Sequence, residues 1–467
     1  MANTLRKTLA LPQIDFQSPQ TRILIGLIAP SVMTGMAHHM FGVTLPAIRE
    51  DFGLDADMVA WVSMIYTLPF IAFMPLYGKL GDDLGKQRLL LWGTVIFFVG
   101  AIMTMLAPNL WWLMGGRAIQ GLGSAGFVPL SIAIIAQRFA ASERGRMMGV
   151  WNSAVPLTGL IVPYIGGLLV DAWGWRAIYP LILVAALISL VMIQRNVPGQ
   201  ARTVNWRYLL QFDWWGVLLL GAALTTLLFY TSSRPITGVA SLQDWRLLAL
   251  CLTLFAILIW WERRCRLPYF NLRIFANSVF TIASFTAGLR MFLMSSISFL
   301  IPLYMDEVHQ SSATLIGVAL ALQAGSLFLV SRYGGELADR WGSRRPVVLS
   351  MGGLILVTGA LALLPANAPI WLILLLAMLH GFVIGISLAP LHRSAMHGVA
   401  DAESGSAAGV YSMIRFAGTI LGTAMAGVLL QRGLTSLHST IGAYQMVFWF
   451  FTAVALAATL LSWRLRD

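Results

Sequence analysis

The chain has 467 residues, of which 58% are hydrophobic and only 11% are charged, whereas a soluble domain carries roughly a quarter charged residues. Its mean hydropathy of +0.77 excludes an ordinary water-soluble protein, because side chains this apolar need lipid as their main solvent. In this setting the formal net charge of +12 is expected to set membrane topology, and we expect no nucleic-acid partner.

Apolar segments long enough to cross a bilayer, which takes about twenty residues, recur along the whole chain. The first segment begins after a short tail, residues 1–22, and is too long to be a cleaved signal peptide. The sequence therefore predicts an integral membrane protein of the all-α class. Fourteen spans are predicted, at residues 23–45, 58–77, 89–107, 110–134, 147–170, 177–194, 213–232, 246–262, 277–300, 313–333, 346–364, 370–391, 405–430 and 443–463.

Basic residues are distributed unevenly between the two sets of loops. If the N-terminus is cytoplasmic, 23 Lys and Arg lie on the inner side, five lie on the outer side and three lie within spans. Cytoplasmic loops carry the excess of basic residues, so this distribution predicts that both termini are cytoplasmic. The short loops and the basic bias also favour a bacterial inner membrane.

One pattern, G-x-L-x-D-x-x-G-x-x-R, occurs at residues 78–88 and again at residues 335–345, each time in a short cytoplasmic loop. The glycines permit a tight turn, and the aspartate can accept from a helix N-terminus or pair with an arginine. A contact of this kind can form in one conformation and break in another, so we predict gating loops. The predicted gating residues are Gly78, Asp82, Gly85, Arg88, Gly335, Asp339, Gly342 and Arg345.

The spacing of the two copies predicts the domain organisation. They begin 257 residues apart, whereas six spans take only about 200 residues, and the surplus fits two additional spans. The sequence therefore predicts an N-terminal six-helix bundle over 23–195, a linker with two extra helices over 196–276, and a C-terminal six-helix bundle over 277–467. Related halves are a common plan in transporters.

With these motifs, the chain resembles the major facilitator superfamily, and specifically its fourteen-helix drug–proton antiporter branch. The repeated loop is the signature of that superfamily, and residues 117–123 match its fourth-helix motif. The resemblance implies a secondary exporter of amphipathic small molecules that works by alternating access, driven by inward proton flow. Further matches are Trp61 and Tyr66 in the second span, Pro163, Gly166 and Gly167 in the exporter motif of the fifth, and 415–418 in the thirteenth.

The chain departs from the branch where an acidic residue is usual in the first span. That place holds Ala37, followed by His38 and His39, and the central parts of the predicted spans contain no Asp or Glu. Ionisable residues inside a membrane are functional candidates by default, and those present here are basic. We therefore expect a basic cavity that favours neutral or anionic substrates.

Ten residues are candidates for substrate binding or coupling, and each has an alternative role. Arginines can serve gating, bind backbone carbonyls or reach the membrane surface; aromatic residues can anchor helices at the interface. Neighbours on a helix diverge by about 100°, so only one of the two adjacent histidines faces the cavity, where it can carry a proton; bonding to a neighbouring helix is the alternative. The candidates are His38, His39, Trp61, Tyr66, Arg117, Gln120, Arg290, Gln323, His380 and Arg415.

The hypothesis is a proton-coupled, multidrug-type exporter, not an enzyme, that acts as a monomer with a small amphipathic substrate, protons and membrane lipids as its partners. No P-loop, metal-ligand cluster or nucleophile elbow occurs, so we expect no cofactor and no metal. One alternative is a lipid or fatty-acid translocase without proton coupling, motivated by the missing carboxylates. A minor alternative is a non-transporting sensor on the same scaffold.

Overall fold

The computed structural model describes residues 18–199, 213–265, 272–397, 399 and 404–465, and the described residues form helices and no strand. Fourteen helices or helix groups are long and apolar enough to span a membrane, which confirms the predicted all-α class and number of spans. The first group of helices, called here the N-terminal group, comprises α2 (Pro19–Phe52), α3 (Ala56–Leu84), α4 (Lys86–Met105), α5 (Leu110–Ser124), α6 (Phe127–Arg138), α7 (Ala141–Asn152), α8 (Ala154–Thr158), α9 (Val162–Trp173) and α10 (Ile178–Asn196).

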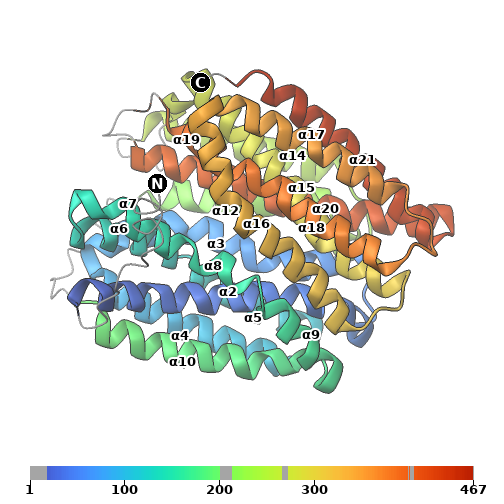
Figure 1. Ribbon diagram of the computed structural model, residues 1–467, viewed down its shortest axis with the longest axis horizontal. Coiled ribbons are helices and arrows are strands. Elements are labelled where there is room, and N and C mark those ends of the chain that lie inside the picture. Colours follow the sequence, from blue (N-terminus) through green and yellow to red (C-terminus); the bar gives the residue numbers. More distant parts are fainter. Residues whose placement is uncertain (1–17, 200–212, 266–271, 398, 400–403, 466–467) are drawn as a thin grey trace, which may run out of the picture.

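The remaining helices follow two stretches of chain that lie outside the described residues. The C-terminal group comprises α15 (Ser278–Glu307), α16 (Ala313–Trp341), α17 (Arg344–Ala362), α18 (Ile370–Ile386), α19 (Leu388–Met396), α20 (Ser404–Leu437) and α21 (Thr440–Ser462). Between the groups, α12 (Trp214–Thr231), the segment 232–244 with the short α13 (Arg234–Thr237), and α14 (Trp245–Arg264) form what we call the inserted hairpin. In Figure 1 the N-terminal group lies below the C-terminal group, and the helices run side by side along the long axis.

Three of the predicted spans are interrupted helices. Span 110–134 is divided into α5 and α6, span 147–170 into α7, α8 and α9, and span 370–391 into α18 and α19. Pro129, Pro163 and Pro390 each fall in the first turn of a new segment, where the missing N–H of proline costs no hydrogen bond. The breaks expose backbone groups inside the molecule, which transporters tolerate where the backbone is buried in protein or lines a water-filled space.

The polar contacts between the two groups gather at one end of the molecule. The end that carries the two repeated loops, residues 78–88 and 335–345, is called the motif end. The contacts between the groups lie at the other end, which we call the opposite end. At the opposite end Arg49 of α2 pairs with Glu307 of α15, and Asp171 of α9 accepts from the backbone N–H groups of Ala313 and Thr314 at 2.8 Å. The groups are therefore closed against each other at the opposite end.

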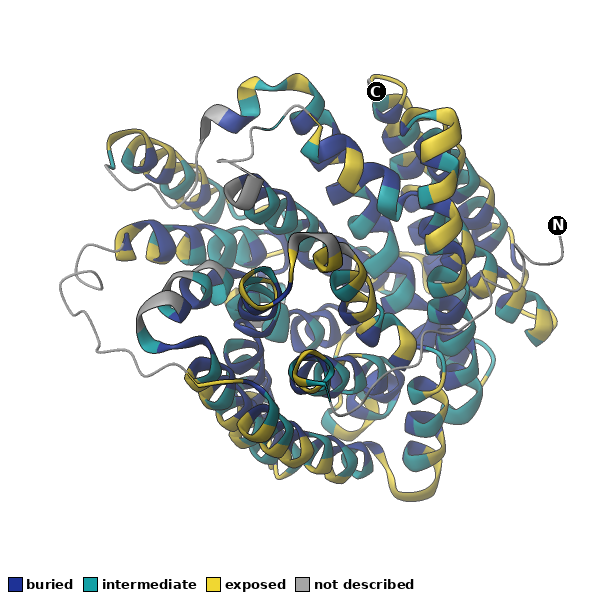
Figure 2. Ribbon diagram, turned by 60° about the vertical axis from the view of Figure 1, so that its left-hand side comes forward, coloured by how far each residue is buried: buried dark blue, intermediate teal, exposed yellow. Residues whose placement is uncertain are grey.

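Burial separates helices that face the lipid from helices inside the assembly. Figure 2 shows exposed residues along the outer faces of the peripheral helices and buried residues where helices pack together. In the membrane-length window of α14 only 17% of residues are buried, compared with 67% in α15. The exposed residues of α14 include Trp245, Leu252 and Trp260, which suits a helix surrounded by lipid.

Candidate functional site

A buried arginine lies at the centre of the N-terminal group. Arg117 of α5 is 3% exposed, and its guanidinium carbon lies 3.6 Å from the centre of the Phe41 ring and 4.8 Å from that of Tyr66. The faces of these rings attract the cation. Its Nη1 donates to Oε1 of Gln120 at 3.3 Å, and Gln120 in turn donates to Thr104 at 2.9 Å. The sequence candidates Tyr66, Arg117 and Gln120 therefore form one cluster.

The two adjacent histidines of α2 lie beside this cluster and have different surroundings. His38 is exposed although its neighbours in α2 are buried or half-buried, so its side chain borders open space at the middle of this helix. His39 is half-buried, and its Nε2 has no hydrogen-bond partner. His39 lies against the break between α8 and α9, where a Cβ added to Gly159 would be 3.1 Å from the imidazole ring. Of the two histidines, His38 has the more exposed side chain.

A second buried arginine, in the C-terminal group, binds the break between α18 and α19. Arg290 of α15 is 2% exposed, and its Nε lies 3.1 Å from both the Ile384 carbonyl and Oγ of Ser387. Ser350 of α17 donates to the same Ser387 hydroxyl at 2.8 Å. The interruption of the helix frees the carbonyl that accepts from the guanidinium, so the break and the charge stabilise each other.

Two further candidates of the C-terminal group form a pair. Gln323 of α16 and His380 of α18 are buried, with Nε2 of Gln323 2.6 Å from Nδ1 of His380. Ser298 donates to the side-chain Oε1 of Gln323 at 3.1 Å, which directs the amide nitrogen to the imidazole. In this arrangement the Gln323 amide donates to Nδ1 of His380, whose buried Nε2 has no hydrogen-bond partner.

The structure adds a residue that sequence reasoning missed. His392 of α19 is exposed, and its ring centre lies 5.4 Å from that of Tyr411. Arg415 of α20 reaches the same Tyr411 ring, with its guanidinium carbon 5.6 Å from the ring centre. The predicted span ended at residue 391, which left His392 in a loop, but α19 continues to Met396. The histidine next to a predicted span end was the one available signal.

Both repeated loops turn at a glycine with a positive φ angle. Gly85 joins α3 to α4 with φ of 91°, and Gly342 joins α16 to α17 with φ of 76°, a region that favours glycine. Asp339 accepts from Nη1 of Arg393 in α19 at 2.6 Å, within the C-terminal group. Asp82 falls in α3, but its side chain lies outside the described residues.

The other glycines of the repeat face equivalent neighbours, and its arginines are exposed. A Cβ on Gly78 would lie 3.5 Å from Pro129 of α6, and one on Gly335 would lie 3.7 Å from Ala389 of α19. Each glycine thus faces the helix segment that follows a break, once in each group. Arg88 and Arg345 are both exposed at the motif end.

The predicted exporter motif places α9 between two other helices. Pro163 lies in the first turn of α9, and its backbone carbonyl lies against Gly317 of α16. Gly166 faces Met40 of α2 at 3.1 Å from an added Cβ, and Gly167 faces the start of α16. The small residues therefore allow α9 to approach α2 and α16 closely.

Trp61 lies apart from both arginine clusters. It is 2% exposed, its Nε1 donates to the carbonyl of Ser232 at 2.8 Å, and its ring centre lies 4.9 Å from that of Phe229. Both partners belong to the inserted hairpin. The structure thus places this candidate in a packing contact with α12 rather than beside Arg117 or Arg290.

Comparison with known proteins places this architecture in one family. A family profile described as Major Facilitator Superfamily matches residues 29–423 and 283–467. Similar proteins include the riboflavin transporter RibZ of Clostridioides difficile (strain 630), 24% identical over 88% of this chain and 89% of that protein. Multidrug resistance protein Stp of Mycobacterium tuberculosis (strain CDC 1551 / Oshkosh) is 28% identical over 84% of this chain and 73% of that protein.

Solved structures show the same fold at low sequence identity. A D-xylose-proton symporter superposes with a TM-score of 0.69 at 13% identity, covering 96% of this chain and 98% of that chain. The inward open conformation of the xylose transporter XylE from E. coli superposes with a TM-score of 0.65 at 15% identity, covering 96% and 97%. The chain is therefore an integral membrane transporter, not an enzyme, and belongs to the major facilitator superfamily.

Proposed function

We propose that this protein exports amphipathic small molecules by alternating access, in exchange for protons, and that its substrates are neutral or anionic. The observation that carries the proposal is the chemistry of the interior. Arg117 in the N-terminal group and Arg290 in the C-terminal group are buried, and the carboxylates of the described helices lie near helix ends. A lipophilic cation entering this interior would meet like charges and no compensating carboxylate.

The orientation of the transport cycle follows from the basic loops and from the closed end. We propose that the motif end faces the cytoplasm, as the excess of basic residues there favours. The contacts at the opposite end then keep the protein closed to the outside, and the exposure of His38 supports a water path that enters from the cytoplasm. Two six-helix bundles would rock about this interior, with the repeated loops as gating elements.

Within this interior, we assign the substrate's polar head to the C-terminal group and proton binding to the N-terminal group. Arg415 and His392 both lie against the Tyr411 ring, and neither is fully buried, so an anionic or hydrogen-bonding head can reach them. His38 is the exposed imidazole beside Arg117, and an imidazole nitrogen can bind and release a proton. The names of the relatives, a riboflavin transporter and multidrug resistance proteins, are compatible with aromatic, amphipathic substrates.

A second candidate function keeps the fold but removes the protons. The interior shows no carboxylate in the central part of the described helices, and carboxylates are the groups that proton-coupled transporters commonly use. An uncoupled lipid or fatty-acid translocase would need only the apolar helix faces and the arginines. Transport that persists unchanged after the proton gradient is abolished would favour this second function.

The test uses everted membrane vesicles with an acidic interior. A permanently charged aromatic sulfonate is added, and the pH gradient is followed with and without the protein. Proton-coupled export predicts that the sulfonate dissipates the gradient only in vesicles that contain the protein, and that His38→Asn abolishes this effect. Sulfonate uptake without any loss of the gradient contradicts proton coupling and leaves the uncoupled function.

A further inference from the structure

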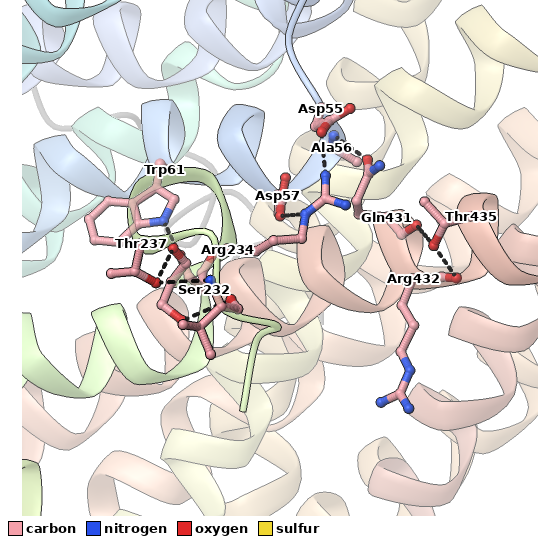
Figure 3. Close-up of polar contacts among 12 residues, drawn as sticks. Asp55, Ala56, Asp57, Trp61, Ser232, Arg234, Thr237, Gln431, Arg432 and Thr435 are labelled. Atoms are coloured by element: carbon pink, nitrogen blue, oxygen red, sulfur yellow. Dashed lines mark hydrogen bonds and ion pairs between the residues drawn. The ribbon is translucent and has the colours of Figure 1, made fainter. Parts of the chain in front are cut away.

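The segment that connects the two inserted helices lies on the first turns of α3. Trp61 of α3 donates to the Ser232 carbonyl, and Ser232 and Ser233 are fully buried. Figure 3 shows Arg234 extending from this segment towards the start of α3, where it lies beside Asp55 and Asp57. The hairpin is therefore attached to the N-terminal group at the opposite end of the molecule.

The charges in this contact are unequal in their exposure. Nε of Arg234 lies 3.3 Å from Oδ2 of Asp57, whose side chain is 1% exposed, and Nη2 of Arg234 pairs with Asp55, whose side chain is 57% exposed. Oδ1 of Asp57 has no hydrogen-bond partner. A buried carboxylate is stable only when a cation or hydrogen bonds compensate it, and Arg234 is the cation that faces Asp57.

The same turns of α3 form the closed contact with the C-terminal group. The backbone N–H of Ala56 donates to Oε1 of Gln431 in α20 at 2.9 Å, and a Cβ added to Gly427 of α20 would lie 2.8 Å from the Ala56 carbonyl. Figure 3 shows Gln431 next to Ala56, close to Arg234. Asp57 therefore lies beside the seam between α3 and α20 that must open in an outward-facing state.

The inserted hairpin also touches the C-terminal group, at its other end. Val217 and Leu220 of α12 pack with Met413 of α20, whereas Phe229 at the end of α12 packs on Trp61 of α3. The hairpin thus contacts both groups through α12, whereas α14 forms its lipid-exposed outer face. A change in the seam therefore changes the surroundings of α12 and of the segment 232–244.

We propose that Arg234 is a positioning residue that keeps the opposite end closed by compensating the charge of Asp57. Without the guanidinium, the buried Asp57 carboxylate loses its cation beside the seam and keeps only the Met58 backbone N–H and the start of α3 as compensation. Separation of α3 from α20 then relieves the charge by admitting water. Removal of Arg234 therefore shifts the population towards the state that is open at this end. The two inserted helices supply this residue.

The experiment measures distances between spin labels at the opposite end of the purified full chain. Labels are placed at Leu106→Cys and Asn367→Cys, two exposed positions that follow α4 and α17, with Cys251 and Cys265 replaced by serine. Pulsed electron–electron resonance then reports how far the two groups are separated. For Arg234→Ala we expect the population at longer distance to rise roughly tenfold, because the buried Asp57 carboxylate loses its cation while the partial exposure of Arg234 screens the interaction.

Three variants distinguish charge compensation from simple packing. Arg234→Ala combined with Asp57→Asn is expected to return to the parent distances, because a neutral amide no longer demands water. Arg234→Lys is expected to retain most of the closed population. Arg246→Ala, which removes an exposed arginine from the same hairpin, is the matched control and is expected to leave the distances unchanged.

Each other outcome overturns the inference. Parent-like distances in Arg234→Ala show that Arg234 does not hold the seam. Equal widening in the double variant or in Arg246→Ala shows that the hairpin acts by packing, without a specific role for the charge. The inference rests on alternating access, so transport by the parent protein is measured in parallel. If the parent transports and Arg234→Ala keeps the parent distances, only this inference is refuted. If the parent does not transport, the proposed function is refuted.

Discussion

The two buried arginines of the interior, Arg117 and Arg290, are stabilised in different ways. Arg117 is held by the faces of two aromatic rings and by one side-chain amide, and its buried Nε has no hydrogen-bond partner. Arg290 donates to a carbonyl and a hydroxyl at the break between α18 and α19. The ring faces attract the Arg117 cation but do not accept its N–H hydrogen bonds. At the helix break, the Ile384 carbonyl and the Ser387 hydroxyl accept hydrogen bonds from Arg290.

This difference indicates that the charge of Arg117 is available for function, whereas the charge of Arg290 stabilises the helix break. Arg117 retains hydrogen-bonding capacity, because its buried Nε has no partner. Arg290 bridges the break between α18 and α19, so its removal takes the charged donor away from the Ile384 carbonyl and the Ser387 hydroxyl and leaves them with serine donors alone. We therefore expect Arg117 to matter most for transport and Arg290 to matter most for stability.

The largest expected effect is the loss of stability in Arg290→Ala. The variant leaves the Ile384 carbonyl and the Ser387 hydroxyl without their charged donor, which costs about 2–3 kcal/mol. Thermal unfolding of the purified protein in detergent measures the change. Arg290→Lys, which restores one charged donor, is the control and is expected to recover part of the loss. Unchanged unfolding of the alanine variant contradicts an architectural role.

Arg117→Ala is expected to reduce transport while leaving the unfolding temperature near that of the parent. A desolvated cation–π contact contributes about 2 kcal/mol, which corresponds to roughly a thirtyfold loss of transport rate if the contact changes during the cycle. Initial rates in vesicles measure the effect. Because lysine lacks the planar guanidinium that stacks on rings, Arg117→Lys is not expected to rescue transport. Loss of folded protein together with transport would remove the distinction from Arg290.

Arg415→Gln is expected to change substrate preference. Arg415 is not fully buried and shares the Tyr411 ring with His392, so a charge contribution of about 1–2 kcal/mol to an anionic head is reasonable there. We expect roughly a tenfold loss for an aromatic sulfonate and little change for a neutral analogue of the same size. Equal losses for both substrates, measured as initial rates, would show that Arg415 acts on the cycle and not on the head group.

The smallest expected effect is that of His380→Ala. The variant leaves the buried amide of Gln323 without its imidazole partner, which costs about 1 kcal/mol in stability. We expect transport to change by less than about twofold, since the two side chains bond to each other and Ser298 bonds to Gln323. A severe loss of transport with normal unfolding would move this pair from packing into the functional site.

The fold could be predicted from the sequence because lipid imposes a simple rule. Each span must be apolar over about twenty residues, and the loop glycines at Gly85 and Gly342 mark equivalent turns in the two groups. The positions of the helix breaks could not be predicted in the same way. Proline at 163 or 390 permits a break, but neighbouring helices decide whether one forms, as the contact of Arg290 with Ile384 shows.

The sequence predicted which residues belong to the candidate site better than it predicted which of them contact one another. Arg117, Gln120 and Tyr66 lie together, and an intramembrane arginine is visible in any hydropathy reading. The contact of Trp61 with the inserted hairpin was not predictable, because its partner Ser232 lies far away in the sequence. His392 was missed because the predicted span ended one residue before it.

The charge of the transported molecule tests the central claim most directly. Purified protein in liposomes is given a permanently anionic aromatic sulfonate or an aromatic quaternary ammonium cation of similar size. The initial rate of uptake is measured for each compound. The proposed function predicts protein-dependent uptake of the sulfonate, reduced in Arg415→Gln, and no uptake of the cation. Uptake of the cation alone would contradict a basic, carboxylate-free interior as the basis of substrate selection.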